Sequence, residues 1–386
     1  MVNKFLILCS RLNLSSEVLS QMESLLESDL NWTELLKKAT KEGVGPLLYR
    51  NLRAFKERIP DASKVELRDM YNKNTARNMY LFQKVKPLLQ AIHDSNLQVA
   101  ITKGARLAES LYQNLSLRPF ADIDLVVHTS AWPELKEILE KLGFSREGDF
   151  GQNLNQKDRE LHWTFTPIFR KERLLVEMHF HYLGLQIPFA LEDDLWACSQ
   201  NIKIGTSPAK VLSPEYELCY LCLHALQHSY YRLIWLTDIA EMSRQQDLNW
   251  EKILDICQKE SISAPLSYGL HLVNCLWPGT LSENILEMFK ISAFELKLLK
   301  FFWPEENVLT RNLSLQFPYY TPTLFSLLRR KKPLLALSTL FKIFFPPRAW
   351  VFYYYKIPVN SPRIFLHYLW RLTRPTSLFF RKLFLH

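Results

Sequence analysis

The spacing of apolar residues divides the chain into two helical regions that flank a segment with strand-like patterns. Apolar positions recur at helical spacing through residues 1–97, and residues 61–95 predict one long helix. The helical pattern returns at Ser213, which with Pro214 forms a cap followed by proline at the first helical position. We therefore expect a helical N-terminal region over residues 1–97 and a helical domain over residues 211–306.

Residues 98–210 alternate short β-like runs with helical ones. Strands are predicted at residues 99–101, 122–127, 161–168 and 174–181, and the first two are each followed by a helix. The order β-α-β-α-β-β describes a small mixed sheet with helices on one side. The expected fold class is therefore α+β: a small mixed β-sheet core flanked by N- and C-terminal helical regions.

The overall composition is that of a globular protein. Of the 386 residues, 48% are hydrophobic and 23% are charged, which excludes a disordered or fibrous chain. The sequence contains no run of about 18 uncharged apolar residues, so we expect no membrane-spanning helix. The first residues lack the pattern of a signal peptide. The six cysteines are scattered, mostly within apolar helical patterns, as is typical of reduced thiols. These features together predict a cytoplasmic protein.

Positive charge is concentrated in residues 307–386. This segment holds 13 Lys and Arg and no Asp or Glu, so the rest of the chain is slightly acidic although the net charge is +9. It also contains 18 aromatic residues. Three interpretations stay open: a helical layer packed on the core, nucleic-acid contact through phosphates and stacking, or contact with a membrane surface. The apolar residues 334–345 beside the basic residues 329–332 are typical of the last.

Two carboxylates two residues apart carry the clearest candidate chemistry. Asp122 and Asp124 lie in one predicted strand, so their side chains leave the same face. Adjacent carboxylates repel each other unless a cation lies between them, and Mg²⁺ commonly binds one or two carboxylates together with substrate phosphates. Glu177 is an isolated acid in the next apolar strand. If the two strands are neighbours, three carboxylates suit a two-metal site for phosphoryl transfer; otherwise the aspartates are the polar face of an exposed strand.

Basic residues close to these acids indicate phosphate binding. Lys103 and Gly104 lie between a predicted strand and a predicted helix, where backbone N–H groups and the helix dipole would face a triphosphate. Arg118 stands in a loop four residues before Asp122, within reach of a phosphate.

Other residues typical of metal or redox sites also have a structural interpretation. Cys219 and Cys222 form a lone Cys-x-x-Cys in a helical pattern, which favours core packing. His224 and His228 are one helical turn apart, which permits a transition-metal site but favours a structural or nucleotide-facing role. His179 shares the face of Glu177 and either approaches the acceptor or packs against its neighbours.

Taken in order, these residues resemble the uncharacterised nucleotidyltransferase family of the DNA polymerase β-like superfamily. That family carries a Lys-Gly turn, a Tyr, an Arg-Pro loop, an Asp-x-Asp strand and a strand with a third carboxylate. The corresponding segments here are residues 101–104, 111–112, 118–126 and 176–179, followed by helical segments at 212–214, 224–228 and 232–240. The resemblance extends from about residue 30 to about residue 260.

The resemblance implies roles for the three acids and a cofactor. Asp122 and Asp124 would be metal ligands, and Glu177 would be the third carboxylate and metal ligand, nearest the acceptor hydroxyl. The implied cofactor is Mg²⁺, in a two-ion site, and the implied substrate is a nucleoside triphosphate.

The resemblance also implies that Lys103, Gly104 and Arg118 bind the nucleotide. The wider superfamily usually has a Gly-Ser turn, whereas Ala105 follows Gly104 here. Lys103, with its backbone neighbours, is therefore the candidate for holding the γ-phosphate.

The function that follows is Mg²⁺-dependent transfer of a nucleoside monophosphate to a hydroxyl of an unknown acceptor, with release of pyrophosphate. The acceptor is a peptide, an RNA end or a small molecule, and transfer of the γ-phosphate is a near alternative. The other alternative is a catalytically inactive nucleotidyltransferase-like module that docks to a membrane surface, RNA or a protein partner through residues 307–386.

Overall fold

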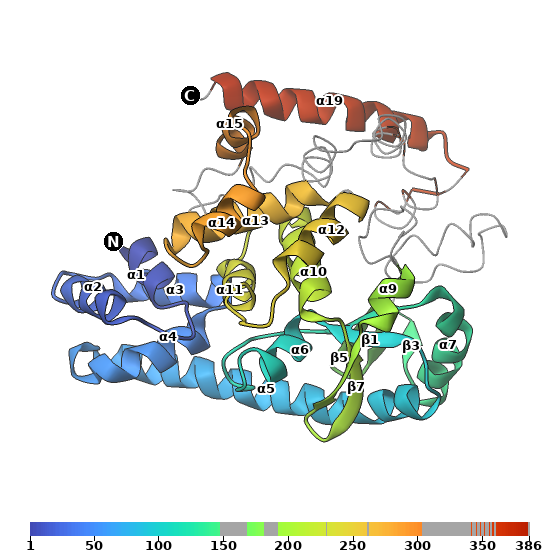
Figure 1. Cartoon of the computed structure of the whole chain (residues 1–386), viewed down its shortest axis with the longest axis horizontal. Helices are drawn as coiled ribbons and strands as arrows, with labels where there is room; N and C mark the ends of the chain where they lie inside the picture. Colours follow the sequence, from blue (N-terminus) through green and yellow to red (C-terminus); the bar gives the residue numbers. More distant parts are fainter. Residues whose placement is uncertain are drawn as a thin grey trace.

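The computed structural model describes residues 1–146, 168–180, 192–228, 230–260 and 262–302, and in the C-terminal region residues 341, 345, 348, 351, 355, 357–358 and 360–384. A mixed sheet lies between one long helix below it and a group of shorter helices above it (Figure 1). The predicted strand at 161–168 falls, except for Ile168, outside the described residues.

The N-terminal region is helical, as its apolar spacing predicts. Its helices are α1 (Val2–Leu8), α2 (Ser16–Leu26), α3 (Trp32–Glu42), α4 (Gly45–Leu52), the 3₁₀ helix η1 (Arg53–Arg58) and α5 (Asp61–Asp94). Side-chain oxygens of Ser15 and Asn31 accept hydrogen bonds from the first turns of α2 and α3 and so define where these helices begin. The long α5 passes beneath the sheet (Figure 1) and buries Leu88, Leu89 and Ile92 against it.

The sheet has seven strands, in the order β3-β4-β5-β2-β1-β7-β6. The strands are β1 (Val99–Thr102), β2 (Ile123–Val127), β3 (Ser145–Arg146), β4 (Ile168–Lys171), β5 (Leu174–His179), β6 (Gln200–Ile204) and β7 (Ser207–Val211). At its centre β2 runs antiparallel to β1 and parallel to β5, and β1 runs parallel to β7. The mixed sheet with flanking helices confirms the predicted fold class, and the β6–β7 hairpin adds two strands that the sequence pattern did not indicate.

Helices within the core segment connect and cover these strands. They are α6 (Lys103–Ser110), η2 (Thr129–Ala131), α7 (Trp132–Lys141) and α9 (Glu192–Ala197). Leu135 and Leu139 of α7 join the apolar layer that α5 forms with the sheet. The expectation of helices on one side only is wrong, because α10 (Pro214–Gln227) places Glu217 and Tyr220 against the opposite face. That face carries polar side chains, which need buried partners.

After the core segment the described chain is helical up to residue 302, and this part is called the helical domain. It contains α10, α11 (Leu233–Met242), α12 (Trp250–Glu260), α13 (Ser263–Leu276), α14 (Glu283–Met288) and α15 (Ala293–Phe302). Cys219 and Cys222 of α10 are buried free thiols within its core, as expected for packing residues. The same apolar core extends to α1, α3 and α4, so the N-terminal helices and this domain are packed together.

The basic C-terminal region is described mainly at its last helix, α19 (Arg363–Phe384). The basic residues 329–332 and most of the apolar segment 334–345, which suggested membrane-surface contact, lie outside the described residues. In the part of the chain that the structure covers, no helix has the length and apolarity needed to cross a bilayer.

Candidate functional site

Parallel pairing of β2 with β5 brings acids from two distant parts of the chain together. Asp124 of β2 is in register with Glu177 of β5, and Thr102 at the end of β1 is in register with Asp124 on the other side. Because side chains in register on neighbouring strands share a face, the carboxylates of Asp124 and Glu177 lie on one surface of the sheet. The condition that the sequence left open, that the two acidic strands are neighbours, is met.

A compact group of metal-ligand atoms forms at this register position. Ligand atoms of Asp124, Glu177 and His179 all lie within 4.8 Å of one another. The Nε2 atom of His179 is 2.9 Å from Oδ1 of Asp124 and 3.8 Å from Oε2 of Glu177. Two carboxylates and an imidazole fit a divalent cation by ligand type. The sequence assigned His179 no definite role, although its place two residues after Glu177 puts both side chains on one face.

Asp122 is near Asp124, Glu177 and His179 but is not part of that cluster of ligand atoms. The residue precedes β2, is half-buried, and is not among the described side chains whose ligand atoms cluster within that distance. Burial, and then the negative charge of Asp124, raise the pKa of Asp122. The two aspartates therefore interact electrostatically, but the acid that stands in register with Asp124 is Glu177.

Lys103 holds a positive charge inside the acidic group. Its Nζ atom is 2.7 Å from Oδ1 of Asp124 and 3.3 Å from Nε2 of His179, and its side chain is 8% exposed. The Nζ atom also lies 5.4 Å from the centroid of the Tyr220 ring, a geometry in which the ring face attracts the cation. The lysine predicted as a phosphate ligand is thus placed beside the candidate metal ligands.

The charges in this group shift one another's proton affinities. Burial alone would raise the pKa of Asp124, but the Lys103 ammonium and the hydrogen bond from His179 outweigh it and hold that pKa well below its usual range. Burial, and then repulsion by Asp124, raise the pKa of Glu177 to about 7. Burial and the nearby Lys103 lower the pKa of His179 to about 4. At neutral pH the site therefore contains one firmly ionised carboxylate, one carboxylate able to gain or lose a proton, and a neutral imidazole.

Glu217 fixes the turn that presents Lys103, and the sequence did not single it out. Its carboxylate has no exposed surface and accepts hydrogen bonds from the Thr102 hydroxyl, at 2.9 and 3.0 Å, and from the backbone N–H of Lys103 at 2.9 Å. Lys103 has φ of +52°, in the left-handed region that L-residues rarely adopt. The signal in the sequence was an acid at an otherwise apolar helical position, but its partners lie 114 and 115 residues away.

Gly104 allows the Arg-Pro loop to pass close to this turn. A Cβ at position 104 would lie 2.4 Å from Cβ of Phe120 and 2.9 Å from Nη1 of Arg118. Because the first contact is with an atom that moves only with the backbone, any larger residue would displace the loop. That loop leads directly into Asp122 and β2, so the glycine sets the distance between the turn and the acidic strand.

Arg118 is buried and forms an ion pair with Asp238, separate from the ion pair between Lys103 and Asp124. Its Nη2 atom is 2.6 Å from Oδ2 of Asp238, and the Tyr112 hydroxyl donates to Oδ1 of the same carboxylate at 2.7 Å. The Arg118 carbonyl accepts a hydrogen bond from the Asn78 amide at 2.9 Å. The structure thus shows Arg118 tying the loop to α11, and its role in phosphate binding stays a prediction.

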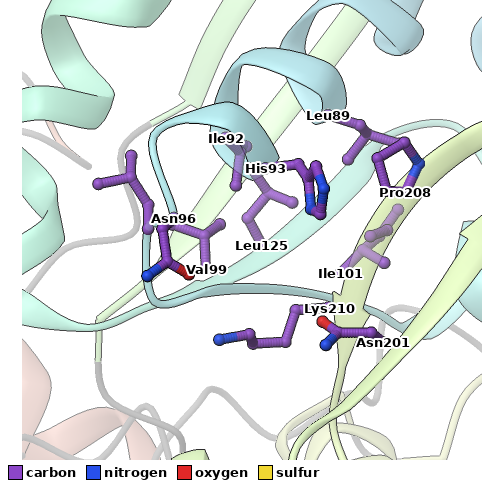
Figure 2. Close-up of a pocket in the computed structure, with 12 residues that line it drawn as sticks. Leu89, Ile92, His93, Asn96, Val99, Ile101, Leu125, Asn201, Pro208 and Lys210 are labelled. Atoms are coloured by element: carbon purple, nitrogen blue, oxygen red, sulfur yellow. The ribbon is translucent and has the colours of Figure 1, made fainter.

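The cavity drawn in Figure 2 is on the other face of the sheet. It has a volume of about 100 Å³ and is lined by Ile101 and Leu125 together with residues such as His93 and Lys210. Ile101 and Leu125 each adjoin a site residue, Thr102 and Asp124, in the same strand. Because neighbouring side chains in a strand point to opposite faces, the sheet separates this cavity from the carboxylates.

Comparisons with known proteins bear on this arrangement. The family model described as "Uncharacterised nucleotidyltransferase" matches residues 28–278, which confirms the resemblance seen in the motifs. Among solved structures, the chain is similar to an antigenic nucleotidyltransferase-like protein from Paracoccidioides brasiliensis, with 22% identity over 48% of this chain and 91% of that one, and a TM-score of 0.31. No curated protein matches the chain.

Proposed function

Because the chain belongs to the uncharacterised nucleotidyltransferase family, we propose that it transfers a nucleoside monophosphate from a nucleoside triphosphate to a hydroxyl group of an acceptor. The observation that supports this most is the convergence of Asp124, Glu177 and His179 within 4.8 Å, with the Lys103 ammonium 2.7 Å from Asp124. A cluster of hard ligands beside a buried cation suits the binding of a divalent metal and a polyphosphate.

In this proposal Asp124 and Glu177 hold Mg²⁺, with His179 beside them and Asp122 at the edge of the group. A bound metal ion would neutralise part of the negative charge on the phosphates. Lys103 binds a phosphate oxygen with N–H donors that now face Asp124 and His179. The left-handed turn and Glu217 keep its side chain directed into the site, so little reorganisation is needed at the moment of reaction.

In the same proposal Glu177 is the general base that accepts the proton of the acceptor hydroxyl. Its carboxylate is in register with Asp124 on the same face of the sheet. The hydroxyl oxygen then forms a bond to the α-phosphorus, the bond from that phosphorus to the bridging oxygen breaks, and pyrophosphate leaves with the electron pair. If the γ-phosphorus were attacked instead, the nucleoside diphosphate would be the leaving group.

The test uses two labels and two variants. The full-length protein is incubated with Mg²⁺, a cell extract as acceptor source and a nucleoside triphosphate carrying label at the α- or the γ-phosphorus. The proposal predicts transfer of α-label and release of labelled pyrophosphate from the γ-labelled nucleotide, both lost in E177Q and retained in the surface variant D69N. Transfer of γ-label would identify a phosphotransferase, and equal transfer by E177Q and the unmodified protein would contradict the proposal.

One observation favours a second candidate function, docking to an anionic membrane surface. On α19, Phe365, Leu366, Leu369, Trp370 and Leu372 are each at least 38% exposed. They share one side of the helix, while Ile364, His367 and Arg371 are buried on the other. The helix carries five Lys and Arg and no acid, a composition that suits an interfacial helix. Sedimentation with vesicles containing phosphatidylserine should be lost in L366E/L369E, and equal sedimentation of the two proteins would contradict this function.

A further inference from the structure

Half-buried aromatic and imidazole rings cluster where α10 ends and α11 begins. His224 lies in the last turn of α10 and His228 is its C-cap, while Tyr231 precedes α11 and Trp235 lies in its first turn. The Trp235 ring lies 4.9 Å from His224, 5.2 Å from His228 and 4.6 Å from Tyr231, between centroids. These four residues, called the ring face below, form one contiguous surface around Trp235.

The ring face continues from the candidate site. The Tyr220 ring packs edge-on against His179, at 5.8 Å between centroids, and lies under the Lys103 ammonium. His224 follows Tyr220 by four residues on α10, so both occupy one side of the helix about 6 Å apart along its axis. The ring face therefore begins about one helical turn along α10 from the tyrosine that lies under the Lys103 ammonium.

The side-chain polar atoms of the ring face have no hydrogen-bond partner among the described residues. In the described part of the chain, neither imidazole, nor the Tyr231 hydroxyl, nor the Trp235 indole N–H makes a side-chain hydrogen bond. The Arg232 side chain is half-buried and likewise has no hydrogen-bond or ion-pair partner among those residues, but its Nη2 atom lies beside Gly43. Since partly buried polar groups usually find partners, these donors and acceptors are available to a ligand.

The chemistry of the ring face selects a flat, uncharged group. Burial and the field of Lys103 lower the pKa of His228 to about 4 and hold that of His224 well below its usual range, so both imidazoles are neutral. Neutral rings offer stacking surfaces and hydrogen bonds but no attraction for phosphate.

We propose that the ring face binds the base of the nucleoside triphosphate, stacked on Trp235 and His224, while the phosphates lie at Lys103. This inference rests on the proposed function and adds to it the part of the chain that recognises the nucleoside. It predicts that the base contributes a measurable share of nucleotide affinity through residues that do not touch the phosphates.

The experiment separates binding of the base from binding of the phosphates. Calorimetry with Mg²⁺ and no acceptor measures the affinity of the full-length protein for α,β-methylene analogues of the four ribonucleoside triphosphates, which cannot undergo nucleotidyl transfer, and for inorganic tripolyphosphate. The variants are W235A and W235F, with W250A as a matched control because Trp250 is also half-buried and packs against Phe289 away from the ring face.

W235A should weaken the tightest-binding nucleotide analogue by about tenfold or more, which is the loss typical of one base-stacking ring. Tripolyphosphate binding should be unchanged in W235A, and W235F and W250A should bind both ligands like the unmodified protein. Equal nucleotide affinity in W235A and the unmodified protein, or equal affinity of that protein for nucleotide and tripolyphosphate, would overturn the inference while leaving the proposed function intact. A protein that binds neither ligand would refute the proposed function and the inference with it.

Discussion

The backbone N–H of Lys103 donates a hydrogen bond to Oε1 of Glu217 at 2.9 Å, and this contact joins the central sheet to the helical domain that follows it. The same carboxylate accepts from the Thr102 hydroxyl, so a single buried side chain satisfies two donors at the end of β1. The turn that it stabilises has Lys103 in the left-handed region, a conformation that costs about 1–2 kcal/mol in an L-residue. Glu217 therefore acts as a positioning residue for Lys103.

Replacing Glu217 by alanine should reduce both stability and activity. E217A leaves two buried donors without an acceptor, at a cost of about 1–3 kcal/mol for each. E217Q keeps one acceptor oxygen and should recover part of each loss. Denaturant unfolding gives the stability, and the rate of pyrophosphate release gives the activity.

Glu215 provides the matched control for this prediction. It is buried on the same helix and accepts hydrogen bonds from Ser213 and from the backbone N–H of Asn249. E215A should lower stability without changing activity at a temperature where it is fully folded. If E217A and E215A had equal effects on activity, Glu217 would have only a structural role.

Enlarging Gly104 should disturb the loop that leads to Asp122. A methyl group at this position meets Cβ of Phe120 at 2.4 Å, so the loop has to move. G104A is expected to cost about 1–3 kcal/mol of folding stability through overpacking. G45A is the control, because the atom that its methyl group meets is the flexible Met70 sulfur at 3.0 Å. Thermal unfolding of both variants tests the prediction, which fails if G104A is as stable as the unmodified protein.

Acid should destabilise the protein in part through His228. Burial, and then the charge of Lys103, lower its folded-state pKa to about 4 from an ordinary value of 6.5. Between these two pH values the unfolded chain binds a proton at His228 and the folded chain does not. The contribution of neutral His228 to the free energy of unfolding is therefore fully present above about pH 6.5 and is lost as the pH falls toward 4. One such proton contributes a slope of up to about 1.4 kcal/mol per pH unit.

The variant H228Q removes this titration and keeps a neutral polar side chain. Urea unfolding at pH 8 and at pH 5 should show a smaller loss of free energy in H228Q than in the unmodified protein. His224, which is also held neutral by burial, should account for part of the slope that remains. Identical pH dependence of the two proteins would show that His228 is protonated as readily in the folded state as in the unfolded one.

Local patterns predicted much of this architecture because the relevant information is local. The period of apolar residues identified the long helix now seen as α5, and alternation placed Asp124 and Glu177 in strands with their side chains on defined faces. The Lys103–Gly104 turn between a strand and a helix was likewise visible in the sequence.

Contacts between residues far apart in the sequence could not be predicted in this way. The partner of Arg118 is Asp238, 120 residues away, and the partner of the Lys103 turn is Glu217. The strand register that selects Glu177 and His179 as neighbours of Asp124 depends on a parallel pairing across 53 residues, which no local pattern encodes. Periodicity also missed the β6–β7 hairpin, a short element at the edge of the sheet.

The central claim of this account is that Asp124, Glu177 and His179 form one site for a divalent cation. Titration of the full-length protein with Mn²⁺, followed by electron paramagnetic resonance of the free ion, measures this directly. E177Q is the informative variant, since D124N also leaves the Lys103 ammonium buried without its partner, which can destabilise the fold. E137Q, on the exposed face of α7, is the control. We predict saturable binding that E177Q weakens by about tenfold or more while E137Q does not, and unchanged Mn²⁺ affinity in E177Q would contradict the account.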